Sequence, residues 1–214
     1  MAFSLRKKDV FGALIIGEAV AWLLVVMLRV NAPELPIPAG LAETLSAQST
    51  AYALAVAFPI LSVIGVAIAA ALSRAISILY QVAKFVLVGA LNTFVDLGIL
   101  NGFILVTGVA SGGGYLLFKT IAFAAALTNS YFWNKHWTFE STGGKTKDEA
   151  VQFGLVSFVG FLLNVATAHI VVNIIGPQAG LAPGVWGNVG ALAAICIALF
   201  WNFFGYKLWV FKKR

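Results

Sequence analysis

The sequence predicts an all-α membrane protein with six transmembrane helices, and three observations support this prediction. First, 61% of the residues are hydrophobic and only 10% are charged, whereas soluble proteins are about 45–50% apolar and about 25% charged. Second, apolar segments recur at close to the ~20 residues that a helix needs to cross a bilayer. Third, one aromatic motif closes two of these segments, which indicates an organisation in repeats.

The aromatic motif occurs at residues 131–139 and 203–211. Both copies read as two aromatic residues followed, after two positions, by Lys-x-Trp-x-Phe. Upstream, residues 84–89 resemble residues 152–157, and each stretch opens a long apolar segment. Because each repeat then holds two spans, the copies are predicted to have the same orientation, related by an axis along the membrane normal.

The first 78 residues match neither repeat. A basic stretch at 6–8 precedes the apolar segment 10–28, which is also how a secretory signal begins, but the length of this segment favours a retained span. A proline-rich turn at 31–38 leads to the second span, 51–73. The predicted organisation is an N-terminal transmembrane hairpin (1–78), a first repeat (79–142) and a second repeat (143–214).

Four further apolar segments complete the six predicted spans. They cover residues 85–107, 115–133, 151–175 and 185–206. Short glycine-containing turns join the two helices of each repeat, and a longer charged loop at 140–150 joins the repeats. No segment outside the spans is long enough to fold as a soluble domain.

Positive charges gather on one side of this six-span map. If the N-terminus is cytoplasmic, twelve of the fourteen Lys and Arg residues lie on the cytoplasmic side, while Arg29 falls in an outer loop and Lys119 within a span. Cytoplasmic loops are enriched in Lys and Arg, so both termini are expected in the cytoplasm. Topology thereby accounts for the net charge of +6, and no nucleic-acid partner is expected.

Polar residues inside the predicted spans are the main candidates for a functional site. Asp96 lies near mid-membrane, and Asn92 lies one turn earlier on the same helix face. Lys119 enters from the outer side, from where its long stem reaches toward Asp96 or outward to the interface. Intramembrane charge is functional by default, with a structural ion pair as the alternative. The aligned second-repeat residues, Asn164 and Ala191, are uncharged, which favours one asymmetric site.

Lysines and aromatic residues mark the predicted cytoplasmic ends of the spans. Lys135 and Lys207 accompany Trp137 and Trp209, where aromatic belts anchor membrane helices. Interfacial anchoring is one interpretation, and contact of the lysines with a lipid phosphate is the other. Glu18 interrupts the first span and is a candidate for tying the hairpin to the repeats. Further candidate residues for a polar lining are Asn129, Asn164, His169 and Asn202, with His169 either a hydrogen-bonded core residue or a proton relay.

No pattern in the sequence indicates catalysis. It lacks a phosphate-binding glycine loop ahead of a helix, a cluster with metal-ligand spacing, and a Ser or Cys beside a plausible base. The single cysteine, Cys196, lies in an apolar run and is interpreted as a packed thiol. We therefore expect no enzyme activity, cofactor or metal.

The two-span repeats resemble those of the GtrA-like family, over roughly residues 79–214. The resemblance rests on Phe-x-x-Val-Gly-x-x-Asn from Phe85 to Asn92, on Asp96 four residues later, and on the closing Lys-x-Trp-x-Phe. Two features depart from the family pattern. The N-terminal hairpin is additional, and Lys stands in both closing motifs where the family often has Arg.

The family is associated with moving polyprenyl-phosphate-linked monosaccharides across bacterial membranes for O-antigen and other surface glycans. The resemblance implies such a translocator in the bacterial cytoplasmic membrane, in which Asn92 and Asp96 bind the sugar. Lys119, Lys135 or Lys207 would then meet the phosphate. Because similar domains occur fused to glycosyltransferases, a scaffold that recruits such an enzyme is the alternative, and a small multidrug-type exporter is a third. Membrane lipids are expected partners, and a homodimer is a candidate assembly.

Overall fold

The structure is a computed structural model that describes residues 5–31, 37–109, 111–141, 146–180 and 183–212. The described part of the chain is predominantly helical and contains no strand. Five helices are long and apolar enough to cross a membrane, which makes the chain a multi-pass membrane protein. These spans are Lys7–Arg29, Gln48–Leu72, Leu79–Thr107, Lys147–Ile175 and Val189–Val210.

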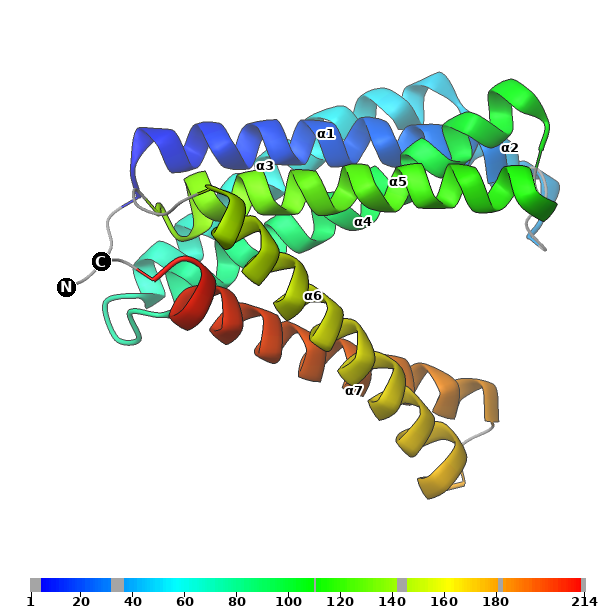
Figure 1. Ribbon diagram of the computed structural model, residues 1–214. Helices are drawn as coiled ribbons and strands as arrows, with labels where there is room; N and C mark the ends of the chain where they lie inside the picture. Colours follow the sequence, from blue (N-terminus) through cyan, green and yellow to red (C-terminus); the bar gives the residue numbers. More distant parts are fainter. Residues whose placement is uncertain (1–4, 32–36, 110, 142–145, 181–182, 213–214) are drawn as a thin grey trace. The chain divides into compact units, whose positions relative to one another are not determined.

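The helices divide between two compact units, Met1–Thr138 (unit 1) and Phe139–Arg214 (unit 2), which are described separately. Unit 1 contains α1 (Lys7–Asn31), α2 (Ala39–Ser46), α3 (Gln48–Leu72), α4 (Leu79–Thr107), α5 (Gly112–Trp133) and the π-helical turn η2 (Asn134–Thr138) (Figure 1). Unit 2 contains α6 (Thr146–His169), α7 (Pro183–Gly205) and the π-helical turns η3 (Ile170–Ile175) and η4 (Tyr206–Val210).

All six predicted spans coincide with helices, but α5 is not among the five that qualify as membrane spans by length and composition. It has 22 residues, and polar side chains such as Lys119, Thr128 and Asn129 lower its hydropathy. The six-span map and the parallel repeats therefore stay predictions. The short helix α2 was not predicted. Residues 32–36 of the proline-rich turn lie outside the described part, as do the loop cation Lys145 and the terminal Lys213 and Arg214.

In unit 1, one face of α1 packs against α3 and α4, and α4 packs in turn against α5. This inner face of α1 includes Ala13, Ile16 and Val20, which are all buried. Gly17 allows close approach to α3, because a Cβ at this position would lie 2.5 Å from the Cα of Pro59. Small residues of this kind matter in membranes, where lipid is as apolar as the side chains and helix association depends on packing.

In unit 2, α6 and α7 lie side by side as a hairpin (Figure 1). Aromatic rings close one end of it: Phe153 stacks on Tyr206 with centroids 4.4 Å apart, and Phe139 stacks on Phe211 at 5.4 Å. The Trp201 indole nitrogen donates a hydrogen bond to the Val156 carbonyl at 3.1 Å. The closing motif of the second repeat thus forms the packed end of this hairpin.

Candidate functional site

Two polar contacts link α4 to α5 within unit 1. Asn92 and Asp96 lie one turn apart on α4, and the Asn129 amide of α5 donates a hydrogen bond to Asn92 Oδ1 at 2.7 Å. The Lys119 ammonium, also on α5, forms an ion pair with Asp96 Oδ2. The structure therefore brings together four of the residues predicted for the site, in a row that we call the α4–α5 polar face.

The α4–α5 polar face lies deep in the helix pair. Asp96 lies eleven positions before Thr107, the last residue of α4, which corresponds to about 16 Å of helix. A hydrocarbon core is about 30 Å thick, so a spanning α4 holds Asp96 well inside it. Charges at such depth are expensive and require a partner, which explains why Lys119 reaches Asp96.

The Asp96–Lys119 pair is only partly enclosed. The Asp96 side chain is 21% exposed and that of Lys119 is 40% exposed. Asp96 Oδ1 is nevertheless buried and has no hydrogen-bond partner among the described residues. A carboxylate oxygen in this state can accept a hydrogen bond from a hydroxyl group, and a half-exposed ammonium can donate to an anion.

An open, shallow hollow lies beside the polar face on the surface of α5. It is mainly apolar, and Asn129 contributes to its wall. The remaining lining residues are Ile121, Ala124, Ala125, Thr128 and Phe132. An amphipathic ligand would therefore find an apolar surface next to hydrogen-bonding groups.

The two lysines of the closing motifs both lie along aromatic rings. In unit 1, Lys135 Nζ is 3.1 Å from the Tyr131 hydroxyl and 5.4 Å from the centre of its ring. In unit 2, Lys207 Nζ lies 5.5 Å from the centre of the Phe203 ring. Aromatic rings attract cations electrostatically, so each ring holds its lysine at the end of a helix.

The other predicted lining residues belong to unit 2. Asn202 packs against Gly160, and its Oδ1 is buried without a hydrogen-bond partner in the part of the chain that the structure describes. His169 is exposed and shares a hydrogen bond of 3.1 Å with Asn173, rather than lying in a core. Asn164 is half-buried and makes no hydrogen bond or ion pair with the residues that the structure describes.

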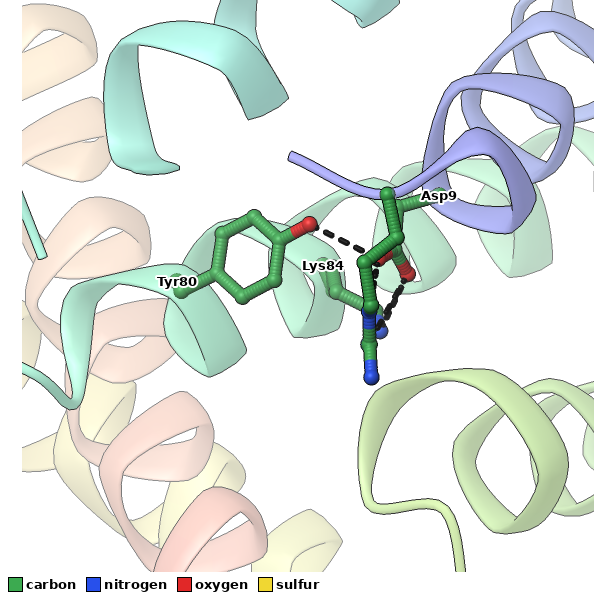
Figure 2. A network of polar contacts seen from close by, with 4 residues as sticks. Asp9, Tyr80 and Lys84 are labelled. Carbon is green, nitrogen blue, oxygen red and sulfur yellow. Dashed lines mark hydrogen bonds and ion pairs between the residues drawn. The ribbon is translucent and has the colours of Figure 1, made fainter. Parts of the chain in front are cut away.

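Sequence reasoning missed a second charged group in unit 1, the Asp9 cluster, made up of Arg6, Asp9, Tyr80 and Lys84 (Figure 2). Lys84 Nζ donates to Asp9 Oδ1 at 2.8 Å, and the Tyr80 hydroxyl donates to Oδ2 at 2.8 Å. Arg6 Nε also donates to Oδ2, at 2.7 Å. The Asp9 and Lys84 side chains are 0% and 1% exposed, so the cluster ties α1 to α4 from inside the protein.

The Asp9 cluster also gives Trp137 a different role from Trp209. Lys84 Nζ lies 4.9 Å from the centre of the Trp137 ring, whose indole packs on Gly12 of α1. Trp137 is consequently 5% exposed, whereas Trp209 in unit 2 is 52% exposed. One sequence signal could have indicated the cluster, because an acid that follows the basic stretch 6–8 at the start of an apolar span needs a partner.

The described residues contain no group of three or more His, Cys, Asp or Glu side chains that could hold a metal ion. The polar face and the closing motifs fall inside a match to a family model, "GtrA/DPMS, transmembrane domain", over residues 84–211. This chain belongs to the GtrA/DPMS family. The matched region begins at Lys84, so α1 and α3 of the hairpin lie outside it.

The chain is also similar to a curated membrane protein. The chain is 29% identical over 128 residues to the Bacillus subtilis (strain 168) protein called "Uncharacterized membrane protein YngA", covering 60% of this chain and 77% of that protein. No solved structure matches the chain. Membership of the GtrA/DPMS family indicates a membrane protein in glycan or lipid-linked sugar processes.

Proposed function

We propose that this protein translocates a polyprenyl-phosphate-linked monosaccharide across the bacterial cytoplasmic membrane, for the synthesis or modification of surface glycans. The single observation that carries the proposal is the α4–α5 polar face. It places an incompletely hydrogen-bonded carboxylate, an amide pair and a half-exposed ammonium within one pair of helices. The proposal assigns no catalytic step to this chain.

The chemistry of the cargo fits these groups. Sugar hydroxyls and a phosphate do not enter hydrocarbon unaided, because each unpartnered polar group costs several kcal/mol. Asp96 accepts hydrogen bonds from the sugar hydroxyls, and the Asn92 amide can accept from them and donate to them. The carboxylate would repel the phosphate, so Lys119 meets that group inside the membrane.

The two closing-motif lysines have a separate role in the proposal. Lys135 and Lys207 each lie beside an aromatic ring at a helix end. We expect these helix ends to lie at the headgroup plane. There they attract the lipid phosphate as point charges. The topology that we propose has six spans, two in an N-terminal hairpin and four in two parallel repeats, with both termini in the cytoplasm.

Reconstitution of the purified protein in liposomes tests the translocation. A fluorescent polyprenyl-phosphate sugar is placed in both leaflets, and an external sugar-modifying reagent that does not cross the membrane is added. At first the reagent reaches only the sugar in the outer leaflet, and the sugar in the inner leaflet is protected. With the protein present, the protected sugar should become accessible over time. Liposomes that contain heat-inactivated protein control for leakage, and equal protection in both samples would refute translocation by this chain.

A scaffold that recruits a glycosyltransferase is the second candidate function. Two observations favour it. The family description pairs GtrA with DPMS, and the basic side chains of Lys147, at the start of α6, and Lys212, after η4, are exposed. A scaffold role predicts that charge reversal at Lys147 and Lys212 weakens enzyme recruitment and leaves translocation in pure liposomes intact. Loss of translocation with unchanged recruitment would favour the first function instead.

A further inference from the structure

We propose that the outer face of α1 binds a transmembrane helix of another protein that presents a basic side chain at mid-membrane depth. This outer face consists of Phe11, Leu14, Ile15, Glu18 and Trp22. The carboxylate of Glu18 is the reason for the proposal. A purely apolar face would be satisfied by lipid, but a carboxylate in hydrocarbon is not.

Glu18 lies at the centre of its span. It lies eleven positions after Lys7 and eleven before Arg29, the two ends of the span, which corresponds to about 16 Å of helix on each side. The hydrocarbon core has about the same half-thickness. The long side chains of Lys and Arg reach the interface from the ends of such helices, but the short Glu side chain at the centre does not.

The side chain of Glu18 points away from the rest of unit 1. Residues on the inner face of α1, such as Ile16 and Val20, are at most 4% exposed. On the outer face, Phe11 is 65% exposed and Trp22 is 43% exposed, and Glu18 itself is exposed. The expectation that Glu18 ties the hairpin to the repeats is therefore not met within unit 1, where Asp9 has that role.

Glu18 differs from the other two acids in the spans of unit 1. Asp9 forms an ion pair with Lys84, and Asp96 forms one with Lys119. The one described polar partner of Glu18 is the Trp22 indole, whose Nε1 donates to Oε1 at 2.7 Å. This neutral donor satisfies one lone pair and leaves the negative charge uncompensated.

Charge complementarity selects the occupant. A Lys or Arg on a facing helix would neutralise Glu18 in a medium where an ion pair is strongly favoured over separate charges. The exposed apolar residues around Glu18 would pack against the same helix. A second copy of this chain would instead bring Glu18 against Glu18, so self-association through this face lacks the complementary charge.

The test uses a designed single-span probe helix of leucine and alanine with one central lysine. Its association with the full chain is measured in liposomes by fluorescence energy transfer, beside a matched probe with leucine at the centre. Only the lysine probe should bind. In Glu18→Gln, which keeps the acceptor for Trp22 and removes the charge, binding should weaken about tenfold or more, as expected when one partner of a desolvated charge pair is lost.

Glu43→Gln is the control variant, because it removes an exposed acid of α2 outside the spans and should bind the lysine probe normally. If Glu18→Gln has the same helical content and the same unfolding midpoint as the wild type, its fold is intact. Equal binding of the two probes, or equal binding of the lysine probe to wild type and Glu18→Gln, would overturn the proposal. Energy transfer between two labelled copies that depends on Glu18 would overturn it in favour of a homodimer.

Discussion

Asp9 and Asp96 are both acids in apolar helices paired with a lysine, yet the structure gives them different roles. The Asp9–Lys84 pair is fully enclosed, and Tyr80 and Arg6 complete the hydrogen bonds of the carboxylate. The Asp96 side chain is 21% exposed, and one of its oxygens has no hydrogen-bond partner among the residues that the structure describes. A saturated, enclosed pair holds helices together, whereas an unsaturated, half-open pair can exchange partners with a ligand.

The first prediction concerns the Asp9 cluster. Asp9→Asn keeps the size of the side chain and leaves the buried Lys84 without its counter-charge, which typically costs about 3–5 kcal/mol of stability. We expect the free energy of unfolding of the purified protein in detergent, measured by circular dichroism, to fall by about this amount. The double variant Asp9→Asn with Lys84→Met removes the orphaned charge and should recover most of the loss.

Two results would contradict this account of the Asp9 cluster. If Asp9→Asn unfolded like the wild type, the ion pair would not hold α1 on α4. If the double variant were no more stable than Asp9→Asn, the loss would come from packing and not from the unpaired Lys84.

At the scale of helices, the sequence predicted every long helix but not how the helices meet. The six apolar segments all fall in helices, because about 20 apolar residues in lipid can satisfy their backbone only by forming a helix. The contact of Asp9 with Lys84 joins positions 75 apart, and no periodicity within one helix indicates such a pair. The packing of Trp137 on Gly12 could not be predicted from the sequence either. This contact buries Trp137, whereas Trp209 in the second closing motif is exposed.

The candidate site was partly predictable for a related reason. Asn92 and Asp96 share a face of one helix, so their spacing already places them together. The sequence allows the Lys119 side chain to reach either Asp96 or the interface, and in the structure it pairs with Asp96. The bond between Asn92 and Asn129 could not be predicted, because it depends on the register between α4 and α5.

The second prediction tests the packing of α1 on α3. Gly17→Val places a Cβ about where the backbone of Pro59 lies, since even the ideal Cβ would be 2.5 Å from the Pro59 Cα. Overpacking of this kind typically costs about 1–3 kcal/mol. Thermal unfolding in detergent should show the loss.

Gly65→Val is the matched control in the same hairpin, because a Cβ on Gly65 meets no atom within 4 Å. It should leave stability nearly unchanged. Equal losses in Gly17→Val and Gly65→Val would mean that α1 and α3 do not pack closely at Gly17.

For the whole molecule, charge asymmetry leads to the third prediction, the topology. Single cysteines at Gly113 and Gly144, introduced into a Cys196→Ala background because the native thiol is exposed, should react with a membrane-impermeant reagent from opposite sides. Gly113 should label from outside in intact cells, and Gly144 only in inverted vesicles. Labelling of both from one side would show that α5 does not cross the membrane and would overturn the predicted six-span map.

The central claim is that the α4–α5 polar face carries a lipid-linked sugar. The most direct test measures transport of that sugar in liposomes that contain Asp96 and Lys119 variants. Asp96→Asn and Lys119→Met should each fold and transport poorly, because the first weakens the sugar contact and the second weakens the phosphate contact. The double variant should transport no better than either single variant. Restored transport in the double variant would contradict the claim, because it would show that Asp96 serves only to neutralise Lys119.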